Sequence, residues 1–253
     1  MKDVLGQAIS DYHHQQLKGK LWVNNKYGLR EEMPVDVYFR EADEMPELEW
    51  IALQKCKGRI LDIGAGAGSH ALMLQKMGLD ITALEISALS AETMRLRGVK
   101  QIIREDFFSF AGAFMDEGTS AKEPRIEGAS AQKDGFDTLL LLMNGIGLAG
   151  TLDGLRRFLQ HARKLLRPGG QLLFDSSDIA YLYKRKKRPA ENYYGEIQYQ
   201  YEYNKQKSDW FNWLFIDKMT LTETASLEGW STEILFEDSS DQFLVRCRTH
   251  SAS

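Results

Sequence analysis

A glycine-rich turn between two apolar segments constrains the fold of this chain more than any other part of its sequence. Residues 59–71 read Arg-Ile-Leu-Asp-Ile-Gly-Ala-Gly-Ala-Gly-Ser-His-Ala. The apolar run predicts a short buried strand, and the glycines allow a sharp turn with no Cβ between backbone and ligand. Apolar residues at helical spacing from Ser69 to Met77 predict a helix whose free N–H groups face that turn. Together these elements predict a nucleotide-type binding loop in a doubly wound α/β sheet.

The spacing of the glycines distinguishes two kinds of nucleotide site. A dinucleotide fingerprint requires G-x-G-x-x-G. Here Gly64, Gly66 and Gly68 give G-x-G-x-G, and Ser69 stands where the last dinucleotide glycine would be. Asp62, two residues before the first glycine, would repel a pyrophosphate but attract a cationic ammonium group. The loop therefore favours a ligand with an amino-acid ammonium, and an NAD(P)-dependent oxidoreductase is the less favoured alternative.

This D-x-G-x-G-x-G pattern resembles the first motif of the class I S-adenosylmethionine-dependent methyltransferases. A second match, Leu-Leu-Arg-Pro-Gly-Gly-Gln-Leu-Leu-Phe at residues 165–174, is similar to the helix-to-strand junction of the same family. The resemblance covers about residues 58–110 and 136–250. It implies a doubly wound, seven-stranded and mostly parallel α/β sheet with an antiparallel last strand. It also implies S-adenosyl-L-methionine as the cofactor and methyl transfer by in-line displacement.

Acidic residues after the second and third predicted strands complete the expected donor site. Glu85 ends an alternating strand about 20 residues after Gly64, where a carboxylate can accept the ribose hydroxyls of a nucleoside. In the resembled family, an acidic residue after the third strand accepts a hydrogen bond from the adenine amino group, and an apolar neighbour packs on the ring. Asp106 and Phe107 fit this pattern. The full set of residues expected to bind the donor is Asp62, Gly64, Ala65, Gly66, Gly68, Glu85, Ile86, Asp106, Phe107 and Asn144.

The turn after the predicted fourth strand is where the resemblance places the reacting groups. Asn144 in Met-Asn-Gly-Ile-Gly-Leu is either a ligand of the donor or acceptor, or an ordinary turn residue. The turn lacks the Asn-Pro-Pro-aromatic motif of many enzymes that methylate amino groups of nucleic acids or proteins, and it resembles enzymes that act on small molecules. Candidates for a general base are Tyr12, His13, His14 and His70, because imidazole titrates in the useful range. None has a diagnostic neighbour, so the sequence identifies no catalytic residue.

The composition limits the classes of binding partner and the cell compartment that we expect. With 253 residues and 43% hydrophobic content, the chain can bury a substantial core. A net charge of −4 argues against a nucleic acid bound through the overall field. The sequence has no apolar run long enough for a membrane span and no signal-peptide core, and its two cysteines indicate neither a disulfide framework nor a metal site. We therefore expect a cytoplasmic protein, monomeric or homodimeric, and the resemblance implies that it methylates an oxygen or nitrogen of a small molecule.

Segments outside the minimal sheet carry separate predictions. Residues 1–57 are expected to form a helical cap or lid ahead of a methyltransferase domain of residues 58–253. Residues 116–135 are small and polar, which indicates a flexible insertion. Residues 193–217 show the alternation of a β-hairpin, placed beside the cleft or at a dimer contact.

The basic run Lys184–Arg188 supports the remaining alternatives. It is either a solvated surface or a contact for an anionic substrate or a nucleic acid. An RNA or protein methyltransferase docking through this run is therefore one alternative function. A protein that binds the donor without catalysis is another, since no residue is identified by chemistry alone.

Overall fold

A central seven-stranded sheet organises the computed structural model, which describes residues 2–112, 135–184, 189 and 191–250. Its strands lie in the order β11-β12-β7-β6-β3-β4-β5. They are β3 (Arg59–Ile63), β4 (Asp80–Leu84), β5 (Ile102–Ile103), β6 (Phe136–Leu141), β7 (Leu166–Ser177), β11 (Trp230–Glu237) and β12 (Gln242–Thr249). The strands from β5 to β7 are parallel, and β12 pairs antiparallel with both β7 and β11. The predicted α/β sheet with an antiparallel last strand is confirmed.

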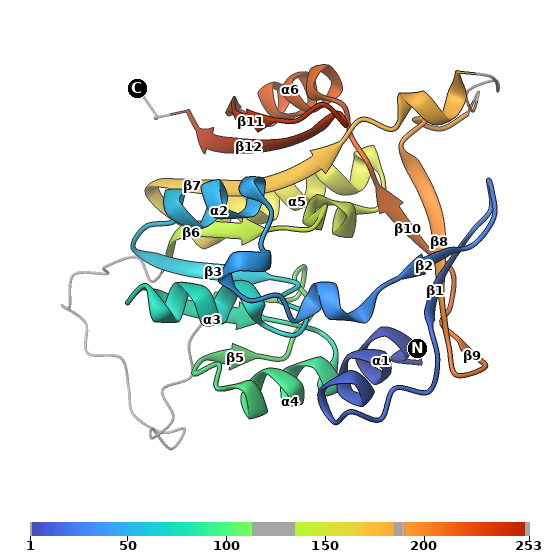
Figure 1. The fold of residues 1–253 in the computed structure, drawn as a ribbon. Coiled ribbons are helices and arrows are strands. Elements are labelled where there is room, and N and C mark those ends of the chain that lie inside the picture. The colour runs from blue at the N-terminus through green and yellow to red at the C-terminus, as the bar shows by residue number, and fades with distance from the viewer. Residues whose placement is uncertain (1, 113–134, 185–188, 190, 251–253) are drawn as a thin grey trace.

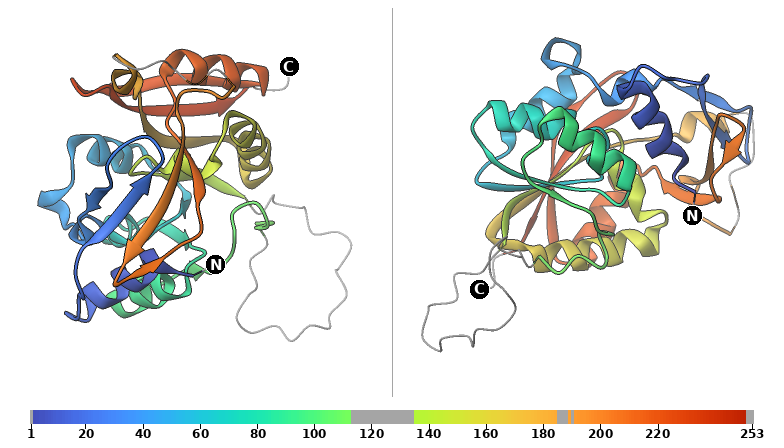
Figure 2. Two further views of the ribbon diagram at one scale, coloured as in Figure 1. Left: turned by 90° about the vertical axis from the view of Figure 1, so that its right-hand side faces the viewer. Right: turned by 90° about the horizontal axis from the view of Figure 1, so that it is seen from below.

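Helices cover both faces of this sheet, as the edge-on view in Figure 2 (right) shows. On one face, α2 (Glu47–Lys55), α3 (Ser69–Lys76) and α4 (Ala88–Arg97) bury apolar side chains against the strands. On the other face, α5 (Leu152–Leu165) and α6 (Lys218–Leu227) do the same. The sheet is therefore buried from both sides, which explains the continuous apolar run of β6.

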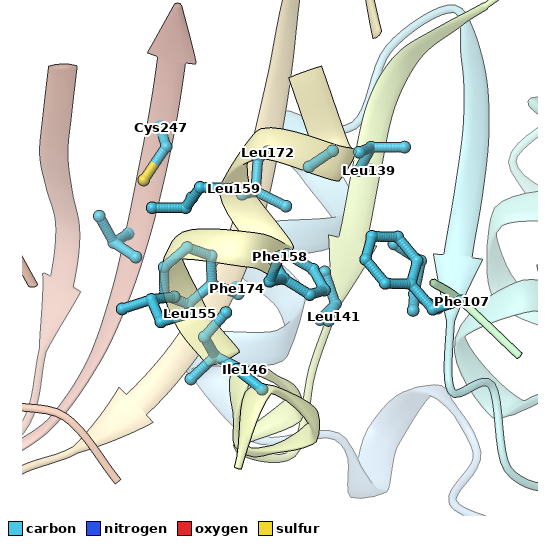
Figure 3. Close-up of a cluster of buried hydrophobic side chains, with 14 of the residues drawn as sticks. Phe107, Leu139, Leu141, Ile146, Leu155, Phe158, Leu159, Leu172, Phe174 and Cys247 are labelled. Atoms are coloured by element: carbon cyan, nitrogen blue, oxygen red, sulfur yellow. The ribbon is translucent and has the colours of Figure 1, made fainter. Parts of the chain in front are cut away.

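The apolar stripe of α5 fills the second of these cores, shown in Figure 3. The helix begins where the Thr151 hydroxyl accepts a hydrogen bond from the Gly154 N–H at 3.0 Å. Phe158 is fully buried, and its ring stacks on that of Phe107 with centroids 4.4 Å apart. The core thus fixes Phe107, which lies in the loop after β5.

A second sheet joins the N-terminal segment to the predicted hairpin. Its strands follow the order β10-β8-β1-β2, with β9 paired to β8. They are β1 (Leu21–Asn25), β2 (Glu31–Met33), β8 (Glu196–Tyr203), β9 (Gln206–Lys207) and β10 (Phe211–Leu214). The hairpin is confirmed by the pairing of β8 with β9 and β10. Figure 1 shows this sheet beyond the carboxyl ends of β3 and β6.

The N-terminal segment contains two α-helices, α1 (Val4–His13) and α2, but it is not only helical. β1 and β2 lie between them, together with the short 3-10 helices η1 (Val35–Tyr38) and η2 (Ala42–Glu44). No strand was predicted here. β1 forms because it pairs with β8, which lies almost 180 positions further along the chain. Two further 3-10 helices, η3 (Gly145–Ala149) and η4 (Ala180–Tyr183), follow β6 and β7.

Two predicted segments fall largely outside the described residues. Of the insertion at 116–135 only Gly135 is described, and of the basic run only Lys184. The division into a cap of residues 1–57 and a domain of 58–253 stays a prediction. Within the described part of the chain, none of the helices has the length and apolar character that crossing a membrane requires.

The Phe158 core gives a direct test of the fold. Phe158→Ala removes a fully buried ring from between α5 and the sheet, and we expect the free energy of unfolding to fall by about 3–5 kcal/mol. Leu227→Ala, at a side chain that is 74% exposed on α6, should change it by less than about 0.5 kcal/mol. Urea denaturation measures both, and equal effects would contradict the packing described.

Candidate active site

A cleft of about 800 Å³ lies at the carboxyl ends of β3, β4 and β6. One side of it is formed by the residues that follow these three strands. The other side is formed by the start of α1, by η1 and by strands of the second sheet. The volume falls within the range of roughly 300–1,000 Å³ that is typical of small-molecule sites.

The glycine turn after β3 forms part of the cleft wall. Gly64, Gly66 and Gly68 have φ angles of +72°, +57° and +83°, which L side chains rarely adopt. A Cβ on Gly66 would lie 3.2 Å from the Tyr38 ring, and one on Gly68 would lie 2.8 Å from the Val99 side chain. The turn therefore needs glycine for its backbone angles and for the close approach of its neighbours.

Glu85 joins this turn to the end of β4. Its carboxylate accepts one hydrogen bond from the Gly66 N–H and one from the Ser87 N–H, each at 2.9 Å. Burial raises the pKa of Glu85, while the backbone hydrogen bonds act in the opposite direction. The carboxylate lies in the cleft wall beside Ile86, whose side chain is 67% exposed.

Asp62, at the end of β3, is a buried carboxylate with an unused acceptor. Its Oδ2 atom has no hydrogen-bond partner among the described residues, and the side chain lines the cleft. Burial raises the pKa of Asp62 to about 6, although the charge of His70 lowers it. Such an orphaned oxygen at a ligand cleft suits a hydrogen-bond donor brought by the ligand.

His70, which acts on the charge of Asp62, belongs to a buried ion-pair network with Glu49 and Arg40. His70 Nε2 lies 2.9 Å from Glu49 Oε2, and Arg40 Nη2 donates to Glu49 Oε1 at 2.8 Å. Burial alone would lower the pKa of His70, but the hydrogen bond to Glu49 and the charge of Asp62 raise it. Of the four base candidates only His70 lies in the cleft. Glu49 and Arg40 were not singled out in the sequence, because only the fold brings α2 to α3.

The other three base candidates lie elsewhere. Tyr12 and His13 pack on Phe39, with ring centroids 4.7 and 6.3 Å away. His14 Nδ1 lies 2.8 Å from the Ser10 carbonyl oxygen at the end of α1. These contacts give all three a structural role at the end of α1.

Asp106 and Phe107 follow β5 at the cleft, but in different environments. Asp106 is exposed and accepts a hydrogen bond from the Phe108 N–H at 2.9 Å. Phe107 is only 7% exposed because its ring packs into the α5 core, whereas the neighbouring Phe108 is 43% exposed; both line the cleft. Sequence analysis did not single out Phe108, and it offers a more open ring to a ligand than Phe107 does.

Asn144 lies at the turn after β6 with a φ of +55°. Its N–H donates to both carboxylate oxygens of Asp175 at 2.8 Å. Its side-chain amide donates to the Leu214 carbonyl oxygen and accepts from the Ser176 hydroxyl, at 3.1 and 3.2 Å. Asn144 lines the cleft, and these bonds give its amide the role of holding the turn against β7 and β10.

The structure thus gathers all the residues expected to bind the donor around the cleft except Gly68, which shapes the turn from behind. It places residues of the predicted hairpin beside the cleft, and it adds Tyr38 and Val23, which the sequence did not assign to the site. Tyr38 lies over Gly66 and is hydrogen-bonded to Tyr201 on β8, and burial raises the pKa of Tyr38 to about 12. The alternation of β8 was visible in the sequence, but which sheet it would join was not.

Comparison with known proteins identifies a family for this arrangement. The chain matches the family described as methyltransferase domain over residues 37–219. It is similar to the crystal structure of a SAM-dependent methyltransferase from Bacteroides fragilis in complex with S-adenosyl-L-homocysteine. That pair has 38% identity and a TM-score of 0.82, over 98% of this chain and 95% of that one.

Two more distant structures share the fold. The CcbJ methyltransferase from Streptomyces caelestis has 15% identity and a TM-score of 0.57, over 85% of this chain and 96% of that one. The sugar N-methyltransferase KedS8 from Streptoalloteichus has 16% identity and a TM-score of 0.52, over 90% and 97%. No protein of curated function matches the chain.

The burial of Asp62 predicts a pH dependence of stability. Because its pKa rises from 3.8 to about 6 on folding, the folded state binds a proton that the unfolded chain releases, and stability falls as pH rises through this window. Between pH 5 and 7.5, the unfolding free energy of the ligand-free protein should fall by about 1 kcal/mol more than that of Asp62→Asn. Urea denaturation at the two pH values measures the difference. Asp43→Asn, at an exposed carboxylate, should follow the unmodified protein; a parallel course for Asp62→Asn would be inconsistent with the raised pKa.

Proposed function

Because this chain belongs to the class I S-adenosylmethionine-dependent methyltransferases, we propose that it methylates an oxygen or nitrogen of a small molecule held in the cleft. The observation that supports this proposal is that the cleft is enclosed on two sides. Strand ends and the glycine turn form one side, and α1, η1 and the second sheet form the other. An acceptor must enter this space to reach the donor, which suits a small molecule better than a folded RNA or protein surface.

The residues present fit the methyl donor. Asp62 offers the orphaned buried oxygen that its ammonium would complete, and the glycine turn leaves no Cβ between backbone and ligand at Gly64 and Gly66. Glu85 would accept the ribose hydroxyls, with Ile86 against the sugar. The family membership decides against the NAD(P)-dependent alternative.

The adenine would lie beside Asp106, between the side chains of Phe107 and Phe108 and the start of α4. The exposed carboxylate of Asp106 is the acceptor for its amino group. The ring of Phe107 is held in the core and is mostly buried, and the ring of Phe108 is the more accessible to the adenine. The roles of Ala65 and Gly68 are to continue the turn, and that of Asn144 is to hold the wall next to the reacting groups.

The bound donor supplies a methyl group already activated by a sulfonium, so the chain has mainly to position the acceptor and exclude water. The walls of the second sheet do both. His70 is the titratable base candidate in the cleft, but its Nε2 is occupied by Glu49. We therefore assign no residue to proton removal, and the proposed mechanism depends on placement.

The proposed donor site is tested by calorimetric titration of S-adenosylhomocysteine. Glu85→Gln keeps the size of the side chain but removes the charge that accepts the ribose hydroxyls, and we expect affinity to fall about tenfold. Glu92→Gln, at an exposed carboxylate on the neighbouring α4 that pairs with Arg95, is the matched control and should bind normally. Equal affinity of both variants would refute the role of Glu85.

The acceptor class is tested with a methyl-labelled donor and a cell extract separated into metabolite, RNA and protein fractions. We expect label in the metabolite fraction. Label confined to RNA or protein would instead support a macromolecular acceptor docked through the run at 184–188. Donor binding without any label transfer would support a non-catalytic binding protein.

A further inference from the structure

Five half-buried aromatic side chains form the wall of the cleft opposite the glycine turn: Tyr199, Tyr201, Phe211, Trp213 and Phe215. Tyr199 and Tyr201 on β8 and Phe211 and Trp213 on β10 lie on one face of the second sheet, because residues two apart in a strand share a face, and Phe215 directly follows β10. Phe211 is paired directly with Tyr199. Ring centroids are 5.2 Å apart between Tyr201 and Phe211, and 6.2 Å apart between Tyr199 and Phe215. We call this set the aromatic wall.

The aromatic wall reaches the place where the reacting groups are expected. Trp213 contacts η3 so closely that a Cβ on Gly147 would lie 2.1 Å from its ring. At the other end, Tyr201 is hydrogen-bonded to Tyr38, which covers Gly66 of the donor turn. Burial raises the pKa values of Tyr199 and Tyr201 above their usual range, so both rings are neutral phenols near pH 7. The wall therefore spans the acceptor side of the cleft with uncharged rings.

The carboxylate of Glu31 lies on the same face of the second sheet as the aromatic wall. Glu31 on β2 is paired with Val23 on β1, and Val23 is paired with Tyr201 on β8. Directly opposed residues of an antiparallel sheet share a face, and all three line the cleft. Within the described residues, the Glu31 side chain has neither a hydrogen bond nor an ion pair, whereas the adjacent Glu32 pairs with Lys20.

The cations that line the cleft do not neutralise Glu31. Arg40 and His70 are both bound to Glu49, behind the donor turn. Lys2 lies next to Asp3, which accepts a hydrogen bond from Ser87 at 2.6 Å on the donor side. The acceptor side of the cleft thus combines aromatic rings with an unpaired negative charge.

We propose that the acceptor carries an organic cation, an amine in its ammonium form or a quaternary ammonium group, which binds between the aromatic wall and Glu31. The cation anchors the acceptor, and the methylated atom is a separate oxygen or nitrogen that has a free lone pair. Aromatic faces attract such cations through their quadrupole, and a carboxylate beside them adds a charge of opposite sign. An anionic acceptor would instead be repelled by Glu31. This inference rests on the proposed function, since it names the substrate class of the same cleft.

The test compares a cation with a neutral molecule of the same shape. Choline and 3,3-dimethylbutan-1-ol are titrated into the protein saturated with S-adenosylhomocysteine, with binding followed by calorimetry. We expect choline to bind at least about fivefold more tightly than the neutral alcohol. Equal affinity for the two probes, or no binding of choline, would overturn the proposal.

Variants of the proposed site, each compared with a matched control, show where choline binds. Glu31→Gln and Trp213→Leu should each weaken choline binding about fivefold or more. Their controls are Glu202→Gln and Trp22→Leu, which change a carboxylate and a ring that both contact Arg30 on the opposite side of the sheet. Binding lost equally in variants and controls would overturn the site. S-adenosylhomocysteine affinity, measured for every variant, shows that the donor site is intact.

The outcomes separate this inference from the proposed function. If S-adenosylhomocysteine binds and small molecules are methylated, but choline is not preferred over its isostere, the cation site is wrong and the proposed function stands. If S-adenosylhomocysteine does not bind the unmodified protein, the donor site is wrong, and with it the proposed function.

Discussion

The hydrogen bonds from the Gly66 and Ser87 N–H groups to Glu85 are the interaction on which the site depends. They join the turn after β3 to the start of α4, so that two neighbouring strand ends present their backbone to one cleft. The glycine turn can approach Glu85 because its residues adopt positive φ angles. Burial makes this carboxylate unfavourable as an anion, and the two backbone donors offset part of that cost.

The two sides of the cleft around this junction form differently. The donor side consists of residues close together in the sequence, and the acceptor side consists of segments that are far apart in the sequence. The donor side consists of short loops after β3, β4 and β5, each a few residues from its strand. The acceptor side requires β1, which carries β2 beside it, to pair with β8, and β8 comes after β7. The two halves of the cleft therefore depend on contacts of different range along the chain.

This division explains what could be predicted from the sequence. The glycine turn with Asp62 and Glu85 could be placed at strand ends because these positions depend on local sequence pattern, and the hairpin of β8 and β10 could be predicted from its alternation. β1 was not predicted because it pairs with β8, far along the chain, and β2 was not predicted because it is a three-residue strand that pairs with β1. The Glu49–His70 pair was not predicted because only the assembled fold brings α2 to α3, whereas the hairpin that carries the aromatic wall was predicted to lie beside the cleft or at a dimer contact.

The most direct test of the central claim, that the glycine turn and Glu85 hold the methyl donor, is a crystal structure of the protein with S-adenosylhomocysteine. The account predicts density along the turn, with the ribose hydroxyls at Glu85, the ammonium at Asp62, and the sulfur directed toward the aromatic wall. Density for the ligand at any other position, with Glu85 still bonded only to Gly66 and Ser87, would contradict it.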